Sequence, residues 1–354
     1  MKEKIITISF VIYIFLFGIF GIIIKDEKIS FSERRQLTTF PEYKMESDYI
    51  KNVDKYFLDH FPFRENFRSI KASFNYNILN MYDNNGIYIK DNYIFKSEYP
   101  TDEKSINNFI EKTNKIKSLL TEDNKTYLMI VPDKNYYLED KNFLQIDYNY
   151  LYNSLNKLDM TKIDLRNTLN LYDYYETDTH FKQQNLDKVV FEMSKAMDFS
   201  YQEIDYKENI YNNFYGVYYG RSAIKRKPEK LIYLENNIIN SCYVNYLENT
   251  NFHEVYNKNK LNSLDSYEVY LDGASSFIEI YNYNNNSNKE LVIFRDSFAS
   301  SLTPLLINYY SKITLIDNRY ISSENFLNYI EFNNQDILFM YSTLVINNSG
   351  TLKG

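Results

Sequence analysis

The longest unbroken run of apolar positions lies near the N-terminus. Residues 5–24 carry no charge and are almost wholly apolar. A helix rises about 1.5 Å per residue, so about 20 residues match the roughly 30 Å hydrocarbon layer of a bilayer. The run ends in Gly-Ile-Ile-Ile-Lys-Asp, without the small-x-small cleavage site typical of a signal peptide. The pattern predicts a short cytoplasmic tail and an uncleaved transmembrane helix within residues 1–25.

The charges on either side of this run predict its orientation. Lys2 and Lys4 precede it, whereas the four charges of residues 25–28 sum to zero. Because positive residues are retained on the cytoplasmic side, we expect the N-terminus to lie in the cytoplasm. The protein is then a single-pass protein of the cell membrane, and its main domain is extracytoplasmic.

Residues 26–83 show helical rather than strand-like spacing. Charged and aromatic residues alternate, and apolar side chains recur at helical intervals, at Tyr56, Phe57, Phe61, Phe67 and Ile70. We predict a helical juxtamembrane segment, which forms either a stalk or a cover on the main domain.

A turn signal marks the start of the main domain, residues 84–354. Asn-Asn-Gly at 84–86 is followed by apolar residues at 87–89 and 93–95. This spacing predicts a β-hairpin.

Buried strands and amphipathic helices alternate through the rest of this domain. We expect one helix with Ser105 as N-cap, a second after His180, and a third with Leu302, Leu305, Leu306 and Tyr309 on one side. Brief apolar runs of strand length occur at 127–131, 291–294, 313–316 and 337–340. This alternation predicts an α/β fold with a mostly parallel sheet, covered by helices on both faces.

The composition agrees with a globular domain and excludes several functions. Of 354 residues, 44% are hydrophobic, which is enough for a sizeable core. The net charge is −7 and the basic residues are spread along the chain, so no nucleic acid partner is expected. Cys242 is the only cysteine, which excludes an intrachain disulfide and a thiolate metal cluster. No phosphate-binding loop occurs among the 8 glycines, and neither a cofactor nor a metal is expected.

Only three histidines are available to a histidine-dependent mechanism. His60 lies in the helical segment and His253 in a polar, loop-like stretch. His180 directly precedes a predicted helix, and Asp178 lies two residues before it. A carboxylate beside an imidazole can fix its tautomer and stabilise the imidazolium that forms when the ring takes a proton. Asp178 and His180 are therefore a candidate orienting acid and general base, although an Asp-x-His pair taken alone is more often structural.

Ser297 lies between a predicted buried strand and a predicted helix. In α/β folds, ligands and nucleophiles lie at the carboxyl ends of strands, where the amides of the turn and helix start can stabilise an oxyanion. Ser297 is thus the candidate nucleophile. The alternative is that Ser297 or Ser300 only caps the helix.

Several blocks of residues carry a family resemblance, in a fixed order that covers nearly the whole chain. The blocks are Glu33–Leu37 with Phe40-Pro41, Asp59–Arg64, Gly86–Phe95, Ile130–Lys134, Tyr175–Phe181, Phe214–Gly216, Arg295–Phe298 and Asp317–Tyr320. Together they resemble the DHHW proteins and, more distantly, the AlgX/AlgJ group of SGNH-hydrolase-like polysaccharide O-acetyltransferases. The resemblance implies an SGNH-hydrolase-like three-layer sandwich with a mostly parallel sheet.

The resemblance also implies a catalytic triad of Ser297 as nucleophile, His180 as base and Asp178 as orienting acid. The motif that names the family has His and Trp where this chain has Thr179 and Phe181. Because neither position belongs to the triad, we expect the change to affect the shape of the pocket rather than the chemistry.

The oxyanion hole and the substrate cleft are less clearly marked. Arg295 replaces the glycine of the Gly-Asp-Ser block, and the SGNH asparagine has no evident counterpart. The Ser297 amide and Gly216 are the oxyanion candidates. Polar residues near predicted strand ends are candidates for the cleft, with loop-settling salt bridges as the alternative reading. They are Lys134, Arg295, Asp317 and Arg319.

The function that the resemblance implies is extracytoplasmic acyl transfer. Ser297 would form an acyl-enzyme and pass an acetyl group to a hydroxyl of a cell-surface polysaccharide. A polytopic membrane acyltransferase would supply the acetyl groups. A carbohydrate esterase would use the same triad with water as acceptor. A non-catalytic polysaccharide-binding or assembly factor is a further alternative. The changes at Thr179, Phe181 and Arg295 favour it, whereas the intact Asp178, His180 and Ser297 argue against it.

Overall fold

The chain folds into two compact units. The computed structural model describes residues 2–44, 48–81, 83, 84, 86–139 and 143–353. The first unit comprises residues 1–87 and 219–227, and the second comprises residues 88–218 and 228–354. The sequence pattern predicts a change near residue 84 but gives no sign that residues 219–227 belong with the N-terminal part.

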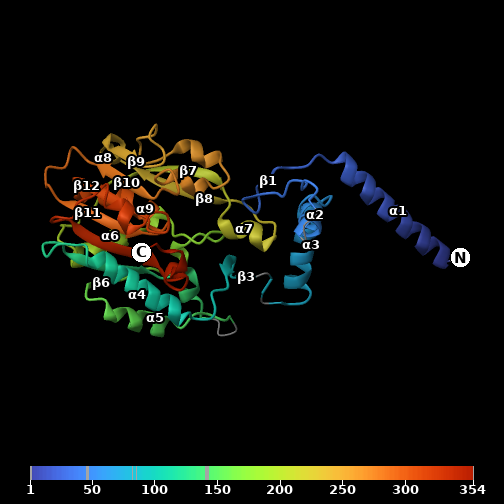
Figure 1. The fold of residues 1–354 in the computed structure, drawn as a ribbon, viewed down its shortest axis with the longest axis horizontal. Helices are drawn as coiled ribbons and strands as arrows, with labels where there is room; N and C mark the ends of the chain where they lie inside the picture. The colour runs from blue at the N-terminus through green and yellow to red at the C-terminus, as the bar shows by residue number, and fades with distance from the viewer. Residues whose placement is uncertain (1, 45–47, 82, 85, 140–142, 354) are drawn as a thin grey trace. The chain divides into compact units, whose positions relative to one another are not determined.

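A seven-stranded sheet forms the centre of the second unit (Figure 1). Its strands are β5 (Thr126–Val131), β6 (Thr161–Asp164), β9 (Tyr243–Tyr246), β10 (Phe277–Tyr281), β11 (Glu290–Arg295), β12 (Lys312–Ile316) and β13 (Asp336–Ser342). The order across the sheet is β6-β5-β13-β11-β12-β10-β9, and the first five strands in this order run parallel. β10 is antiparallel to both of its neighbours. The four predicted apolar runs coincide with β5, β11, β12 and β13.

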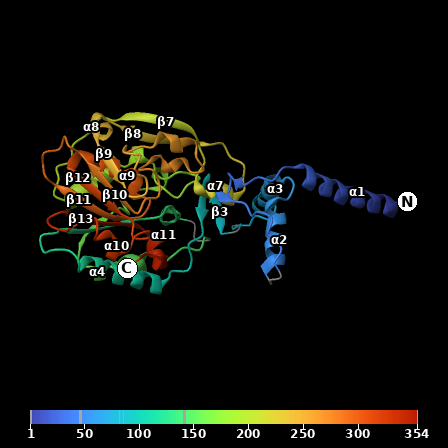
Figure 2. The same ribbon diagram turned by 45° about the horizontal axis from the view of Figure 1, so that its top comes forward.

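Helices cover both faces of this sheet, as Figure 2 shows from a second direction. On one face, α6 (Asp187–Ala196) and α9 (Ala299–Leu306) share a hydrophobic core with the sheet. On the other face, α4 (Glu103–Lys117), α5 (Tyr148–Ser154) and α10 (Ser323–Phe326) share a second core with it. Two cores around one central sheet make three layers, and this confirms the predicted α/β sandwich.

The helix predicted from Ser105 begins earlier than expected. Asp102 is its N-cap, and the Asp102 carboxylate accepts a hydrogen bond from the Ser105 amide at 3.0 Å. The Ser105 hydroxyl donates instead to the Ile346 carbonyl at 2.9 Å. Both residue types cap helices, so the local pattern did not decide between them, and a contact distant in sequence did.

The hairpin predicted at the start of the main domain is present. β3 (Ile87–Lys90) pairs with β4 (Tyr93–Lys96). Asp91 and Asn92 between them have φ values of 47° and 70°, the positive values that a tight hairpin turn requires. Asn85, part of the predicted turn before β3, lies outside the described residues.

A second antiparallel hairpin and several short helices complete the second unit. The hairpin consists of β7 (Lys207–Phe214) and β8 (Glu229–Glu235). The short helices are α8 (Asn237–Ser241), α11 (Thr343–Ile346) and the 3-10 helices Lys134–Tyr137, Leu155–Lys157, Leu171–Asp173, Gln183–Asn185, Lys258–Asn262, Ser266–Val269, Ile307–Tyr309 and Ser349–Thr351.

The first unit contains the apolar N-terminal helix and two amphipathic helices. α1 (Lys2–Ile23) is long and apolar enough, over Lys2–Gly21, to cross a membrane. α2 (Asp48–Asp59) and α3 (Arg64–Asn77) account for the helical spacing seen in the sequence.

Two short strands in the first unit were not expected from the sequence. β1 (Ile29–Ser30) pairs with β2 (Arg35–Gln36). Each strand has only two residues, too few for an apolar period to be recognised.

Residues 219–227 join the first unit through close backbone contact at α7 (Val217–Ser222). A Cβ atom on Gly220 would lie 1.5 Å from the Ser32 carbonyl oxygen, so only glycine allows this approach. The Gly220 carbonyl accepts a hydrogen bond from Arg68 Nη2 at 2.7 Å.

Candidate active site

Ser297 lies in the turn between β11 and α9, at the carboxyl end of a central parallel strand. The preceding residue, Asp296, holds this turn. Its Oδ1 accepts the Phe298 amide at 3.0 Å, and its Oδ2 accepts the amide of Ser342, the last residue of β13, at 2.7 Å. The turn is thus tied to the neighbouring strand, and the half-buried Ser297 is held in a fixed position.

The structure brings the three triad candidates together. His180 Nε2 lies 2.8 Å from Ser297 Oγ, and His180 Nδ1 lies 2.6 Å from Asp178 Oδ1. An ionised carboxylate can only accept, so the proton of a neutral imidazole belongs on Nδ1. Nε2 is then free to accept the hydrogen bond that the Ser297 hydroxyl donates. This is the arrangement that a serine nucleophile and its base require.

Asp178 is held by backbone amides as well as by the imidazole. Its Oδ1 accepts the His180 amide at 3.0 Å, and its Oδ2 accepts the Val217 amide at 2.7 Å. The loop closes on itself, because the Tyr175 amide donates to the His180 carbonyl at 3.1 Å. The orientation of the carboxylate is therefore set by its own loop and by the start of α7.

Lys134 is buried beneath the loop of residues 175–180 and binds its backbone carbonyls instead of lining a cleft. Its side chain is only 2% exposed, and Nζ donates to the carbonyls of Tyr175, Glu176 and Asp178 at 3.1, 3.1 and 2.8 Å. The ammonium also lies 5.1 Å from the centre of the Tyr218 ring. The expected substrate contact is therefore replaced by a positioning contact.

Glu229 of β8 holds the same loop from another side. Its carboxylate accepts the Glu176 amide at 2.6 Å, the Thr177 amide at 2.8 Å and the Thr177 hydroxyl at 2.5 Å. Nothing in the sequence around Glu229 marks it as part of a site, and sequence reasoning missed it.

Tyr267 packs against the face of the candidate base. Its ring stacks on the His180 imidazole with centroids 3.8 Å apart and planes 8° apart. Burial raises the pKa of the Tyr267 phenol well above its usual value, so the phenol stays neutral and donates to Ser301 Oγ at 2.8 Å. The stack fixes the plane in which His180 can reach Ser297. The chain has 37 tyrosines, and no sequence signal singles this one out.

The backbone amide of Gly216 already donates a hydrogen bond within the protein. It donates to Thr177 Oγ1 at 2.8 Å. A Cβ atom at this position would lie 2.3 Å from the Asp178 amide nitrogen and from the Thr177 carbonyl carbon. The geometry thus speaks against the expected oxyanion role for Gly216 and gives it a packing role against the loop. In the part of the chain that the structure describes, the Ser297 amide has no hydrogen-bond acceptor.

Arg295 is buried behind the Ser297 turn rather than exposed in a cleft. It is 1% exposed, and its guanidinium donates to Ser300 Oγ at 2.8 Å and to the Ser275 carbonyl at 3.1 Å. Burial lowers the pKa of Arg295, while the neighbouring Asp317 carboxylate opposes that shift. The residue that departs from the Gly-Asp-Ser pattern therefore belongs to the core.

Asp317 and Arg319 form an ion pair with each other. Arg319 donates from Nε to Asp317 Oδ1 at 2.9 Å and from Nη2 to Oδ2 at 2.6 Å. The Arg319 amide also donates to Asp317 Oδ1 at 3.1 Å. The loop-settling salt bridge, the alternative weighed from the sequence, is what the structure contains.

Other predicted features lie in structural positions. His60 Nε2 contacts the Thr38 carbonyl at 2.8 Å, and His253 Nδ1 contacts the Val244 carbonyl at 2.9 Å. Phe181, expected to shape the pocket, is fully buried. Among the described residues, no group of three or more His, Cys, Asp or Glu side chains is placed to hold a metal ion.

Known structures share this architecture. No protein-family model matches the sequence, and no curated protein matches it significantly. A DHHW family protein from Eubacterium siraeum is 18% identical, with a TM-score of 0.64 over 77% of this chain and 97% of its own. Bacillus cereus PatB1 is 17% identical, with a TM-score of 0.60 over 77% of this chain and 98% of its own. PatB1 with a sulfonyl adduct is 18% identical, with a TM-score of 0.57 over 73% of this chain and 97% of its own.

The O-acetyltransferase domain of Pseudomonas putida AlgJ matches less well. It is 10% identical, with a TM-score of 0.45 over 74% of this chain and 92% of its own. The similarities to the DHHW family protein and to PatB1 show that this chain has their fold, and this confirms the fold that the resemblance of the sequence implies.

Proposed function

We propose that this protein is a serine-dependent acyltransferase that moves acetyl groups onto a cell-surface polysaccharide. The observation that carries the proposal is the continuous path from Asp178 Oδ1 through both ring nitrogens of His180 to Ser297 Oγ, with distances of 2.6 and 2.8 Å. A serine hydroxyl is a weak nucleophile unless an adjacent base takes its proton, and His180 is placed to do so.

In the first half of the reaction, Ser297 Oγ attacks the acyl carbonyl of the donor. His180 Nε2 takes the hydroxyl proton as the new C–O bond forms, and Asp178 stabilises the resulting imidazolium. The Ser297 amide, in the turn before α9, is the proposed donor to the oxyanion. When the tetrahedral intermediate collapses, the bond to the leaving group breaks and His180 returns the proton to it. The product is an acyl ester on Ser297.

In the second half, a sugar hydroxyl takes the place of the leaving group. His180 removes its proton, the hydroxyl oxygen attacks the acyl carbonyl, and Ser297 leaves with the proton that His180 returns. The acetyl ester is thereby transferred to the polysaccharide, and the free serine is restored. Water in place of the sugar would make the protein an esterase with the same triad.

The cellular setting of the proposal rests on α1 and on the resemblance of the sequence. α1 would hold the second unit at the outer face of the cell membrane, where the acceptor polysaccharide lies. The resemblance implies a polytopic membrane acyltransferase as partner, which would deliver the acetyl groups, one per turnover.

The direct test is the acyl-enzyme itself. The purified full chain is incubated with a chromogenic acetyl ester, and intact mass is used to look for an acetyl-sized increase. We expect one acetyl group on Ser297 and a loss of turnover of about 10⁴-fold or more in Ser297→Ala. Ser194→Ala is the matched control, because the Ser194 hydroxyl donates within its own helix. An adduct that persists in Ser297→Ala, or full turnover by that variant, would refute the assignment.

The same experiment separates transferase from esterase. Oligosaccharides with free hydroxyls are added to the acylated protein, and both acetylated sugar and free acetate are measured. Acetyl transfer to sugar at the expense of acetate supports the proposed function, whereas acetate alone identifies an esterase.

A further inference from the structure

A stripe of apolar side chains runs along one face of α3. The residues recur at intervals of three and four, which places them on one side of a helix. All of them are between 40% and 64% exposed. They are Phe63, Phe67, Ile70, Phe74 and Ile78. Phe67, Ile70 and Phe74 lie on one face of α3, and Phe63 and Ile78 flank its two ends. Exposed large apolar side chains gathered in this way mark an interaction surface.

The opposite face of α3 packs against the rest of the first unit. Ala72, on that side, is fully buried. Arg68 donates to the Gly220 carbonyl at 2.7 Å, Asn75 to Asn84 Oδ1 at 3.0 Å, and Tyr76 to the Ile87 carbonyl at 2.6 Å. The helix therefore uses its polar face for contacts with the rest of the unit, whereas its apolar face stays at least 40% exposed, the reverse of an ordinary surface helix.

α2 also exposes apolar side chains on one side and makes polar contacts on the other. Its Ile50 and Phe57 are exposed and lie on one side, with Phe61 just beyond the helix end. On the other side, the Asp59 carboxylate binds the Arg35 guanidinium at 2.9 Å through Oδ2. Two consecutive helices thus present apolar side chains outward.

The turn between α2 and α3 contacts α1 through aromatic rings. Phe61 and Phe67 lie 5.6 and 5.9 Å from Phe17, and Phe63 lies 5.5 Å from Phe20. The apolar run of α1 ends at residue 24. At 1.5 Å per residue, Phe20 and Phe17 lie about 6 and about 10 Å inside that end. Amphipathic interfacial helices bury their apolar face to about 5–10 Å, which is the depth of these contacts.

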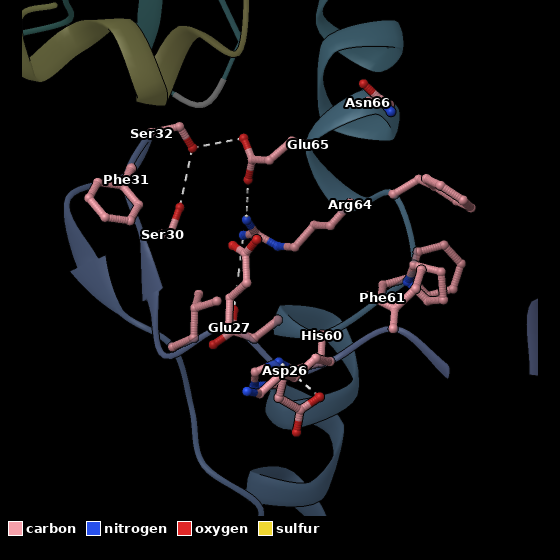
Figure 3. A pocket seen from close by; sticks show the side chains of 16 residues that line it. Asp26, Glu27, Ser30, Phe31, Ser32, His60, Phe61, Arg64, Glu65 and Asn66 are labelled. Carbon is pink, nitrogen blue, oxygen red and sulfur yellow. Dashed lines mark hydrogen bonds and ion pairs between the residues drawn. The ribbon is translucent and has the colours of Figure 1, made fainter. Parts of the chain in front are cut away.

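The polar side of the same turn faces a pocket of about 440 Å³ at the end of α1. Figure 3 shows Ser32 and Glu65 hydrogen-bonded to each other, with Arg64 beside them and Phe61 on the far side of the group. Polar groups thus gather at the end of α1, and aromatic rings gather along its apolar run. This is the order of groups expected at a bilayer surface, from headgroup region to acyl chains.

We infer that α2 and α3 form a second, interfacial membrane contact, which lies in the bilayer surface at the end of α1 with the α3 stripe against lipid acyl chains. The occupant of the stripe is lipid, because the stripe is continuous with the rings that touch a membrane-spanning helix. The inference rests on α1 being an inserted anchor and is independent of the proposed acyl transfer.

The chain contains no tryptophan, so a single introduced tryptophan is an unambiguous reporter. Phe74→Trp tests the stripe, and Phe191→Trp on α6 is the matched control, because both phenylalanines are 46% exposed. Phe10→Trp marks α1 itself. Each full-length variant is reconstituted into phosphatidylcholine vesicles whose acyl chains carry bromine, which quenches indole fluorescence on contact. Iodide, added to the water, quenches those tryptophans that are exposed to water.

We expect bromine to quench Phe74→Trp and Phe10→Trp strongly, and iodide to quench only Phe191→Trp. Ile70→Trp, a second stripe position, should behave like Phe74→Trp. If iodide quenches both stripe reporters and bromine does not, the stripe lies in water and the inference is wrong. Shielding from both quenchers would show that a protein surface, such as a second copy, covers the stripe. The inference is also wrong if bromine quenches Phe191→Trp as strongly as Phe74→Trp. It is equally wrong if bromine does not quench Phe10→Trp, because α1 is then not inserted in the bilayer.

Discussion

At Asp178, the carboxylate determines which ring nitrogen of His180 carries the proton. Oδ2 accepts the Val217 amide and Oδ1 lies against Nδ1 of the imidazole. In Asp178→Asn, only one of the two positions keeps an acceptor oxygen, although Oδ1 accepts the His180 amide and Oδ2 the Val217 amide. With the oxygen at the Val217 amide, the new N–H group faces Nδ1. That favours the tautomer with its proton on Nε2, which cannot accept from Ser297. We expect kcat for acetyl-ester turnover to fall about 10⁴-fold without loss of folded protein, as judged by circular dichroism.

The matched control for this change is Asp164→Asn. Asp164 pairs with Arg166 in an exposed ion pair, which contributes little to stability and has no role in the proposed chemistry. Its kcat should stay within a few-fold of the wild type. Wild-type kcat in Asp178→Asn would remove Asp178 from the mechanism.

At the residue scale, the sequence could indicate the candidates whose signal is local. Asp178 and His180 are two residues apart, and Ser297 lies in a strand-turn-helix pattern. Lys134 could be picked out near a predicted strand end, but neither its role nor that of Glu229 has such a signal, because their partners are backbone groups 41 and 53 residues away. A side chain that binds backbone carbonyls or amides leaves no complementary residue type in the sequence, so its role becomes visible only in three dimensions.

At the element scale, strands were predictable where they are buried on both faces. β5, β11, β12 and β13 are continuous apolar runs, as central parallel strands are. The edge strands β6 and β9 alternate or are largely exposed, so their short patterns do not stand out from loops.

The packing of the loop that carries Asp178 and His180 against Gly216, in the turn before α7, leads to a second prediction. Gly216→Ala would place a Cβ atom 2.3 Å from the Asp178 amide nitrogen, so the loop must move. We expect a loss of about 1–3 kcal/mol in the free energy of unfolding and a fall in kcat. Gly350→Ala is the matched control, since a Cβ atom there meets nothing within 4 Å. Equal melting temperatures and equal kcat for the two variants would show that the loop does not depend on this contact.

At the scale of the whole molecule, the N-terminal segment and the α/β sandwich differ in how they are organised. The sandwich is built around one sheet and was foreseeable from alternating patterns along the sequence. The first unit is completed by residues 219–227, which are distant in the sequence. The contact that brings them in is a backbone approach at Gly220, and such an approach produces no periodic pattern. The limits of this unit could therefore not be predicted from the sequence.

The orientation of the chain across the membrane can be tested by labelling introduced cysteines, because the single native cysteine, Cys242, should not react. Cys242 is buried, and burial raises the pKa of its thiol to about 12, so less than about 1 in 10⁴ is thiolate at neutral pH. The wild type should thus resist a membrane-impermeant maleimide. Ser287→Cys, on an exposed loop of the second unit, should react in intact cells, whereas Glu3→Cys should react only after lysis.

The result decides from which side of the membrane the acyl group reaches Ser297. If Ser287→Cys reacts from outside, the triad is separated by the bilayer from acyl donors made in the cytoplasm. The acyl group on Ser297 must then be delivered across the membrane, and in the proposal the polytopic acyltransferase does this. If only Glu3→Cys reacts from outside, the triad faces the cytoplasm, no delivery is needed, and a cell-surface acceptor is excluded.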